Sequence, residues 1–229
     1  MNVVYALTHH VYPQILPSMR SLADTNPDAQ VFVLAEDDEL PFELPVKATV
    51  INVTGQTYFP EDGVNYSNYY KYINLLKVRY PSYLPVDKVI HLDIDTIVCD
   101  SLKEMWETDL EGKWFAACME SRANYRPFGD KYYNMGVALI NLEQMRKDRI
   151  EQTMQDYLND VKQPYADQDA WNKYAIEQDK VVELPVRWNE SCVTGRTGNP
   201  GIVHFCGYRD WFTRFSMPRV EYLNLYRQR

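Results

Sequence analysis

Residues 89–100 read VIHLDIDTIVCD, an apolar run that ends in two aspartates and then resumes as an apolar run. The apolar and β-branched residues at 89–92 predict a short buried strand. Aspartate is disfavoured inside strands, so Asp93 and Asp95 are expected at the point where this strand leaves the sheet. The stretch therefore predicts a strand that carries two carboxylates at one end.

Two neighbouring carboxylates raise each other's pKa unless a positive charge lies between them. A divalent cation is the simplest such charge, and oxygen ligands suit Mg²⁺ or Mn²⁺, which complete their coordination shells with phosphates and water. The alternative is a solvated turn whose aspartates cap a following helix at residues 101–108. The local pattern leaves both interpretations open.

Length and charge limit the class of protein. The 229 residues suit one large α/β domain better than two small ones, and no internal repeat or low-complexity linker divides them, so we expect residues 1–229 to form a single domain. With 24 Lys and Arg residues against 32 Asp and Glu residues, the net charge of −8 argues against a nucleic-acid-binding surface. No apolar run approaches the ~20 residues needed to cross a bilayer.

The N-terminal sequence and the spacing of the cysteines indicate the cellular compartment. Residues 1–8 lack the basic start and long apolar centre of a secretion signal, and they predict a first strand instead. The absence of a close CxxC spacing excludes zinc ribbons and thioredoxin-type redox chemistry. The four cysteines are Cys99, Cys118, Cys192 and Cys206. We therefore expect a cytoplasmic protein with reduced thiols. The protein is expected to be free in the cytoplasm or to lie at the inner face of the membrane.

Strand-like runs alternate with stretches of helical periodicity along the chain. The expected strands are residues 2–7, 31–34, 48–53, 89–92, 114–119, 137–140, 181–184 and 202–205. The expected helices are residues 13–23, a helix that ends near residue 80, and residues 102–106, 141–158 and 167–176. This alternation predicts an α/β fold with a mostly parallel central sheet and helices on both faces, similar to Rossmann-like nucleotide-binding proteins.

Three segments fall outside this alternation. Residues 56–68 are polar and aromatic and predict a flap, and residues 121–133 predict a loop rich in Arg, Tyr and Gly. Residues 213–229 predict a C-terminal helical tail in which arginines alternate with apolar residues. Such a tail suits docking on the domain, and it also suits peripheral contact with an anionic membrane.

Further polar side chains occur at the ends of apolar runs. They are Asn134 and Gly136 before one run, Asp167, Gln168 and Asp169 at a helix start, Trp188 and Asn189 after a strand, and His204 and Gly207 at another strand end. Ligands of open α/β sheets bind at the carboxyl ends of the strands, so we expect these residues to line one crevice. Taken singly, the acids also suit a helix N-terminus, and the histidine and tryptophans also suit core packing.

The order of these motifs resembles glycosyltransferase family 8, which includes glycogenin and bacterial galactosyltransferases that extend lipo-oligosaccharide. The resemblance covers residues 3–211. The matching motifs are Asp93-Ile-Asp95 within HLDIDTIV, NMGVALIN at residues 134–141, DQDAWN at residues 167–172, Trp188-Asn189 and His204-Phe-Cys-Gly207. Each motif alone is weak, but five of them in this order are specific.

The resemblance implies a retaining hexosyltransferase of the GT-A fold that uses a UDP-sugar donor and Mn²⁺, with Mg²⁺ as the alternative ion. The acceptor would be a hydroxyl group of a glycan, a glycolipid or a protein-linked sugar. Asp93, Asp95 and His204 would hold the metal, and Mn²⁺ accepts such mixed carboxylate and imidazole ligands. The ion would bridge the donor diphosphate and neutralise charge on the departing UDP.

The resemblance also implies three groups of donor contacts. The uridine side comprises Ala6, Thr8, His10 and Tyr12, with Tyr12 available to stack on the base. The diphosphate and sugar side comprises Lys77, Asp169, Gly207 and Arg209. The catalytic group comprises Asn134 and Asp167, which would bind sugar hydroxyls, and Gln168, which would lie near the anomeric carbon. Glutamine is a poor nucleophile, which favours front-face attack by the acceptor over a covalent intermediate, although both mechanisms remain open.

Two departures from the family pattern concern the donor. After the His-x-x-Gly motif the chain reads Gly207-Tyr-Arg-Asp-Trp211, one residue shorter than expected, with Arg209 as the nearest cation in place of a lysine. Arginine can bind a phosphate at least as well as lysine. The stretch Thr8-His9-His10 also differs from the acidic or Thr-Asn versions expected beside the uridine, so base selectivity is an open question.

Two other functions fit part of the sequence. Phosphatases of the haloacid dehalogenase type carry Asp-x-Asp on their first strand and need a later lysine and acidic pair, whereas here Asn134 stands where an acid is required. A catalytically silent member that binds a nucleotide sugar or glycan would have no need of Asp93, Asp95 and His204 together. Sugar transfer is therefore the prediction, with the donor sugar and acceptor undetermined.

Overall fold

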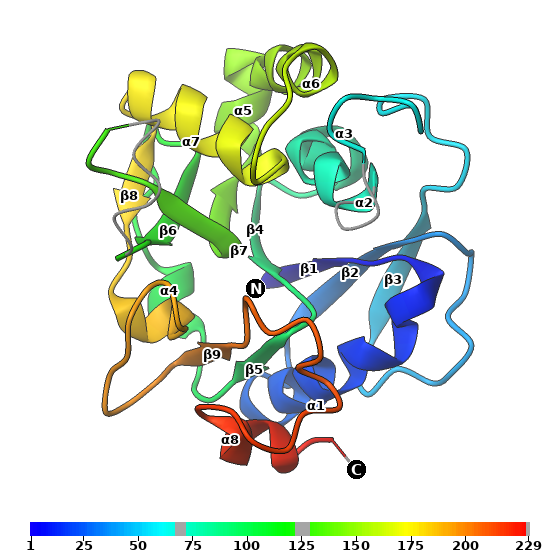
Figure 1. The fold of residues 1–229 in the computed structure, drawn as a ribbon, viewed down its shortest axis with the longest axis vertical. Helices are drawn as coiled ribbons and strands as arrows, with labels where there is room; N and C mark the ends of the chain where they lie inside the picture. Colours follow the sequence, from blue (N-terminus) through cyan, green and yellow to red (C-terminus); the bar gives the residue numbers. More distant parts are fainter. Residues whose placement is uncertain (67–71, 122–128, 228–229) are drawn as a thin grey trace.

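The computed structural model describes residues 1–66, 72–121 and 129–227. The described residues form a central seven-stranded sheet with helices on both faces (Figure 1). Its strands, in spatial order, are β3 (Ala48–Asn52), β2 (Gln30–Ala35), β1 (Asn2–Ala6), β4 (Lys88–Leu92), β7 (Tyr133–Asn141), β6 (Phe115–Met119) and β8 (Val181–Glu183). Parts of the predicted flap and loop, at residues 67–68 and 122–128, lie outside the described residues.

The prediction of a mostly parallel sheet is confirmed. Strand β1 pairs in parallel with β2 and β4, β2 pairs in parallel with β3, and β6 pairs in parallel with β8. Strand β7 runs antiparallel to both of its neighbours, β4 and β6. The amino end of β7 therefore lies beside the carboxyl end of β4, which is the edge where a ligand is expected.

The start of β7 corrects one predicted boundary. We expected a strand at residues 137–140 preceded by a polar segment, but the strand begins at Tyr133, so Asn134 and Gly136 lie inside it. The strand extends to Tyr133 because Tyr133 pairs with Met119 of β6. The Asn172 side chain donates to the Tyr133 carbonyl oxygen (2.8 Å) and accepts from the Tyr133 amide (2.6 Å), so a side chain satisfies these backbone groups beyond the end of the pairing with β4.

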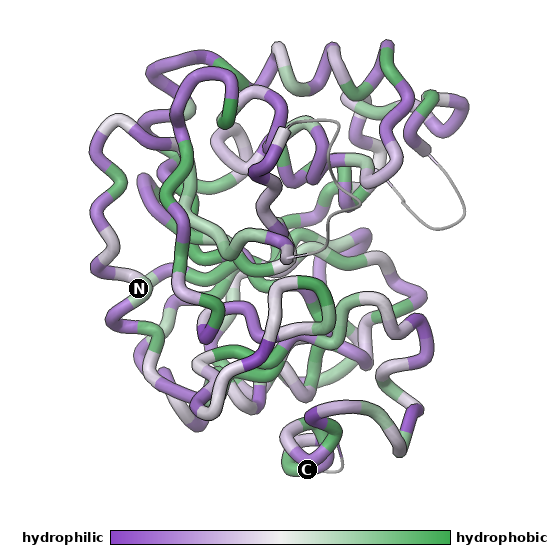
Figure 2. Tube along the Cα trace, turned by 60° about the vertical axis from the view of Figure 1, so that its left-hand side comes forward, coloured by the Kyte–Doolittle hydropathy of each residue, from purple (hydrophilic) through white to green (hydrophobic). Residues whose placement is uncertain are grey.

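Two apolar layers cover the faces of the sheet. Helices α2 (Tyr72–Leu75), α3 (Tyr80–Tyr83), α5 (Leu142–Asp148), α6 (Ile150–Asp160) and α7 (Asp167–Glu177) pack on one face, and α1 (Ile15–Thr25) and α4 (Lys103–Trp106) pack on the other. Strand residues alternate between the layers, as a period of two requires: Val4 faces the first layer, while Val3 and Tyr5 face the second. Figure 2 shows the hydrophobic segments running through the centre.

A second, two-stranded sheet was not predicted in full. The apolar run after Asp95 forms β5 (Thr96–Val98), which pairs antiparallel with β9 (Ile202–His204). The alternative interpretation, in which the aspartates cap a helix at residues 101–108, is wrong, because β5 separates them from α4, and Leu102 precedes α4 without a side-chain cap.

Two other details complete the fold. The helix predicted at residues 141–158 is broken at Arg149, whose φ of 53° ends α5 and begins α6. In the C-terminal tail, α8 (Val220–Asn224) packs Leu223 into an apolar cluster with Ile97 and Phe205. Among the described residues, no helix combines the length and apolar character that crossing a membrane needs.

Candidate active site

Two backbone pairings bring the predicted metal ligands together. At the end of β4, the Asp93 amide donates to the Gly136 carbonyl oxygen of β7 (2.7 Å). At the start of the β5–β9 pair, the Phe205 amide donates to the Asp95 carbonyl oxygen (2.9 Å). The junction of the two sheets therefore places His204 beside both aspartates, although it lies far along the chain.

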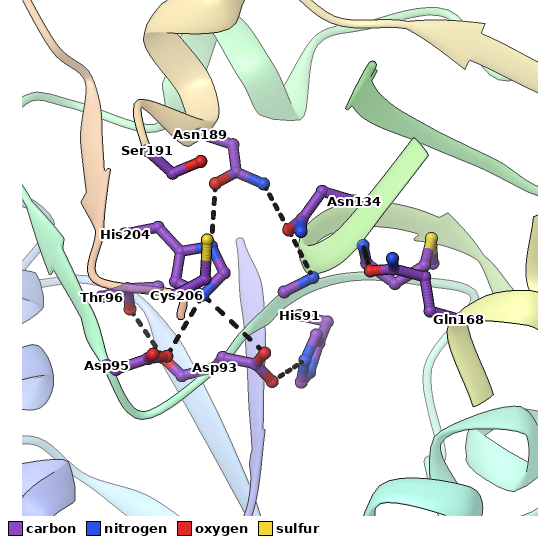
Figure 3. Close-up of polar contacts among 12 residues, drawn as sticks. His91, Asp93, Asp95, Thr96, Asn134, Gln168, Asn189, Ser191, His204 and Cys206 are labelled. Atoms are coloured by element: carbon purple, nitrogen blue, oxygen red, sulfur yellow. Dashed lines mark hydrogen bonds and ion pairs between the residues drawn. The ribbon is translucent and has the colours of Figure 1, made fainter. Parts of the chain in front are cut away.

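Asp93, Asp95 and His204 form what we call the acidic cluster (Figure 3). The His204 Nε2 atom lies 3.2 Å from Asp95 Oδ1 and 3.9 Å from Asp93 Oδ2, and one ligand atom from each residue lies within 4.8 Å of the others. His204 Nδ1 lies 2.9 Å from the Asn189 side-chain oxygen, which can only accept, so Nδ1 carries a proton. In the neutral ring, Nε2 then presents its lone pair to the cluster, as a metal-binding histidine requires.

The charges of the acidic cluster favour a cation. Burial lowers the pKa of His204, but the negative charges of Asp95 and Asp93 outweigh that effect and raise the pKa above its ordinary value. The carboxylates thus stabilise a positive charge at Nε2, and a divalent ion between the same three groups would be stabilised for the same reason. Two carboxylates and one imidazole form a donor set that fits Mn²⁺ or Mg²⁺.

Gly136 makes room for the acidic cluster. A Cβ atom at this position would lie 2.2 Å from His204 Cε1 and 2.7 Å from Asp93 Oδ2. Both distances are far below van der Waals contact, so a larger residue would displace two of the three ligands. The glycine of the NMGVALIN motif is therefore required by this close approach.

Lys77 and Asp167 extend the charged region on the Asp93 side. The buried Lys77 Nζ lies 2.7 Å from Asp93 Oδ1 and 4.0 Å from Asp167 Oδ2. Burial tends to raise the pKa of Asp93, but Lys77 and His91 outweigh it and hold that pKa well below its usual range. Burial raises the pKa of Asp167 to about 7, although Lys77 opposes the shift. At neutral pH, Asp93 is ionised and Asp167 is partly protonated.

A second group of polar residues lies next to the acidic cluster. Glu120 Oε1 accepts hydrogen bonds from Asn134 Nδ2 (2.9 Å) and Gln168 Nε2 (3.1 Å). Gln168 Oε1 accepts from the Met135 amide (2.9 Å), and Asn134 Oδ1 accepts from Asn189 Nδ2 (2.8 Å). We call Glu120, Asn134, Gln168 and Asn189 the amide network. Each bond fixes which end of an amide faces its neighbour, so two of the predicted catalytic residues, Asn134 and Gln168, are held in one orientation.

The two groups are joined through Asn189. Its side-chain oxygen accepts from His204, and its side-chain nitrogen donates to Asn134. Asn189 is fully buried at the end of the 3₁₀ helix η4 (Val186–Asn189). A continuous chain of hydrogen bonds therefore links the predicted metal ligand to the residues predicted to contact the sugar.

Sequence reasoning missed two residues of the site. Glu120 directly follows the apolar strand β6, which is the same signal that identified Asp93 at the end of β4. His91 lies within β4 on the same face as Asp93, and its Nε2 atom is 3.0 Å from Asp93 Oδ1. Burial lowers the pKa of His91 to about 4, with a further contribution from the Lys77 ammonium. The alternation of β4 could have indicated this second contact.

Asp169 is buried and forms hydrogen bonds that stabilise the segments next to the site. Its carboxylate accepts from the Tyr132 hydroxyl (2.6 Å) and from the Tyr165 amide (2.7 Å), and only 2% of the residue is exposed. These bonds tie the start of α7 to the segment before β7. A contact between Asp169 and the donor stays a prediction.

The residues predicted to border the uridine follow the carboxyl end of β1. Ala6 ends the strand, Thr8 is buried, and His10 is exposed in the 3₁₀ helix η1 (His9–Gln14). Tyr12 is 2% exposed, and its hydroxyl accepts from the Glu36 amide (2.9 Å). The Tyr12 ring therefore packs in the core in this structure, with little of its face open for a base.

The last predicted donor contacts follow β9. Gly207 adopts a φ of 83°, a left-handed conformation that favours glycine, and it turns the chain directly after the His204 segment. Arg209 is exposed two residues later. Their position next to the acidic cluster in sequence is compatible with the predicted contact to a diphosphate.

Most of the chain matches a known family. A sequence model described as Glycosyl transferase family 8 matches residues 4–213. The chain belongs to glycosyltransferase family 8. The match includes every residue of the acidic cluster and the amide network, and it confirms the resemblance drawn from the motifs.

Individual relatives support the family and the fold. General stress protein A of Bacillus subtilis is 28% identical over 169 residues, which cover 61% of this chain and 58% of that protein. Lipopolysaccharide 1,2-glucosyltransferase of Escherichia coli is 30% identical over 131 residues, 52% of this chain and 38% of that protein. The chain thus spans about three-fifths or less of these curated relatives.

A crystal structure of the galactosyltransferase LgtC in complex with donor and acceptor sugar analogs has the same fold. It superposes with a TM-score of 0.79 at 20% identity, covering 99% of this chain and 95% of that chain. At this level of identity the likeness concerns the fold alone. The family 8 chain therefore has the predicted GT-A architecture.

Proposed function

We propose that this family 8 protein is a retaining hexosyltransferase that moves a hexose from a UDP-sugar to a hydroxyl group of a carbohydrate or glycoconjugate. The observation that carries the proposal is the acidic cluster, in which two carboxylates and a histidine Nε2 converge at the edge of the sheet. The two carboxylates repel each other, and a bound cation would add to the positive charge that Lys77 already places beside Asp93. The family match and the fold support the same function.

Asp93, Asp95 and His204 would hold Mn²⁺, with Mg²⁺ as the alternative. When bound, the ion would act as a Lewis acid that neutralises charge on the diphosphate leaving group. Lys77 is buried beside Asp93 and has a raised pKa because Asp93 and Asp167 outweigh its burial, so it supplies a permanent positive charge on the same side. Gly207 and Arg209 would contact the diphosphate from the segment after β9.

The sugar would lie against the amide network. Asn134 and Asp167 would hydrogen-bond its hydroxyl groups, and Gln168 would lie near the anomeric carbon. Both ends of the Gln168 amide already bond to Met135 and Glu120, which suits an orienting role. An amide oxygen is also a weak nucleophile, so we propose front-face attack by the acceptor hydroxyl.

The remaining predictions concern the rest of the chain and its location. Ala6, Thr8, His10 and Tyr12 would border the uridine, and Asp169 would support the donor side. Residues 1–229 would act as one domain in the cytoplasm, with the tail at residues 213–229 as the segment available for contact with the inner face of a membrane. The acceptor would be selected by the segments at residues 56–68 and 121–133, which the sequence predicts as a flap and a loop.

A panel of UDP-sugars tests the proposal directly. Purified protein with Mn²⁺ is incubated with each UDP-sugar and a set of sugar acceptors, and the release of UDP is measured. We expect one UDP-sugar to be consumed, at a rate that chelation of the metal abolishes and that Asp95→Ala removes. If a UDP-sugar binds but none is consumed with any acceptor, the protein is instead a silent nucleotide-sugar-binding member of the family.

A further inference from the structure

A buried tyrosine and a buried histidine lie on the core side of Asp93. Tyr80, the first residue of α3, and His91 of β4 are 0% and 1% exposed. The Tyr80 hydroxyl lies 3.0 Å from His91 Nδ1, and His91 Nε2 lies 3.0 Å from Asp93 Oδ1. The three side chains therefore form a line that begins in the core and ends at a predicted metal ligand.

The chemistry of the partners fixes the direction of the second bond. A carboxylate oxygen only accepts hydrogen bonds when it is ionised, so His91 Nε2 must be the donor to Asp93. In the neutral imidazole, Nδ1 then accepts from the Tyr80 hydroxyl. The Tyr80 contact thereby holds the proton of His91 on the nitrogen that faces the carboxylate.

The two oxygens of Asp93 face different groups. Oδ1 accepts from His91 and from Lys77 Nζ (2.7 Å), whereas Oδ2 lies 3.9 Å from His204 Nε2 on the side lined by Gly136. Two donors on Oδ1 fix the rotation of the carboxylate about its Cβ–Cγ bond. Oδ2 is consequently the oxygen presented to the other members of the acidic cluster.

We propose that His91, held by Tyr80, is a positioning residue that turns Asp93 Oδ2 toward the bound divalent cation. The inference rests on the proposed function, since it assigns a role to residues behind the metal site. Outer groups that orient a ligand typically change metal affinity by about 10–100-fold when they are removed. The effect of His91 is therefore expected in metal affinity first and in turnover as a consequence.

The test measures Mn²⁺ binding in the presence of UDP, from the electron paramagnetic resonance signal of the free ion. His91→Leu removes the donor at similar volume, and we expect Mn²⁺ affinity to fall about 10–100-fold. His91→Gln is the matched variant, because its Nε2 amide can still donate to Asp93, and we expect it to keep the affinity within about threefold. Both variants lose the imidazole, so a merely structural role would affect them alike.

Tyr80→Phe keeps the test valid if His91→Leu does not fold, because it removes only one hydroxyl group. We expect an affinity loss of a few-fold, smaller than that of His91→Leu. The inference is overturned if wild-type protein binds Mn²⁺ and those of the variants His91→Leu and Tyr80→Phe that fold bind it equally well. If wild-type protein itself does not bind Mn²⁺ with UDP, the proposed metal site is wrong, which is a separate result.

Discussion

The acidic cluster and the amide network are adjacent and linked through Asn189, yet their polar atoms are satisfied in different ways. In the amide network, Asn134 and Gln168 each donate to Glu120 and each accept from a nitrogen of the same chain. In the acidic cluster, two carboxylates converge on the single Nε2 of His204. The Asn134 and Gln168 amides of the network are paired within the chain, whereas the proposed cation would add positive charge between the two carboxylates of the cluster, beyond that of Lys77 beside Asp93. We therefore propose that the amide network orients the substrate and that the acidic cluster binds an ion.

The largest expected effect comes from Asp95→Asn, which separates function from stability. The metal's contribution to the departing charge is worth several kcal/mol, so we expect transfer to fall by about 10³-fold. The free energy of unfolding without metal should change by less than about 1 kcal/mol, because the substitution also removes repulsion from Asp93. Transfer assays and urea unfolding measure the two quantities.

The matched control for Asp95→Asn is Glu183→Gln, which changes an exposed carboxylate at the end of β8. We expect it to leave both transfer and unfolding unchanged. A loss of several kcal/mol of stability in Asp95→Asn would mean that the carboxylate has a structural role, and the contrast between the two regions would disappear.

Gly136→Ala tests the point at which the two regions meet. The Gly136 amide donates to Asn134 Oδ1 and its carbonyl accepts from Asp93, while an added Cβ would lie 2.2 Å from His204 Cε1. We expect a loss of Mn²⁺ affinity and of transfer of about 100-fold, together with about 1–3 kcal/mol of stability from overpacking. Gly198→Ala is the control, because nothing lies within 4 Å of its added Cβ. Equal behaviour of the two variants would contradict the packing argument.

Glu120→Ala is expected to affect stability and activity together. The substitution removes the acceptor shared by the buried Asn134 and the half-buried Gln168, so both amides lose a partner, at a cost of about 1–3 kcal/mol in the free energy of unfolding. The same loss should lower kcat about 10–100-fold with little change in Mn²⁺ affinity, because the acidic cluster is intact.

Glu120→Gln distinguishes the acceptor from the charge. Its side-chain oxygen can still accept from both amides, and we expect it to restore most of the stability and activity lost in Glu120→Ala. If Glu120→Gln is as inactive as Glu120→Ala, the negative charge of Glu120 matters for the reaction, and the amide network is more than an orienting device.

The acidic cluster could be predicted from the sequence, in part from a local signal and in part from the family resemblance. Asp93 and Asp95 interrupt an apolar run, which favoured a cation at these two carboxylates. The family resemblance, which rests on the order of the motifs, then added His204 as the third ligand. The short β5–β9 pair that joins the cluster was not predicted, because a three-residue strand leaves almost no periodicity to detect.

Only part of the amide network was predicted, because strand pairing determines which of its residues are neighbours. Nothing in the local sequence shows that β7 runs antiparallel to β4, and this direction places Asn134 beside the end of β4. Glu120 becomes visible only when β6 is known to lie next to β7. Likewise, the sequence identifies His91 only as a strand residue, because its proposed role depends on a contact with Tyr80, which lies in a separate helix.

The smallest expected effect is the change in the free energy of unfolding with pH that Asp167 causes. The ordinary pKa of Asp167 is 3.8, and burial raises it to about 7 in the folded protein, where the residue faces Lys77, Asp93 and Asp169. Between these values the folded state binds more protons than the unfolded state, so rising pH removes stability. Asp167→Asn cannot ionise, and its free energy of unfolding relative to wild type should increase by about 1 kcal/mol from pH 5.5 to pH 6.5.

Urea unfolding of metal-free protein at the two pH values measures this difference, with Asp179→Asn as the control. Asp179 is exposed, and Lys113 lowers its pKa, so its substitution should give no rise in relative stability with pH. Amides do not titrate, and Asn134→Ala should therefore destabilise the protein equally at both values. A pH-independent difference for Asp167→Asn would show that Asp167 is ionised throughout and belongs, like Asp93, to the permanent negative charge that attracts the cation.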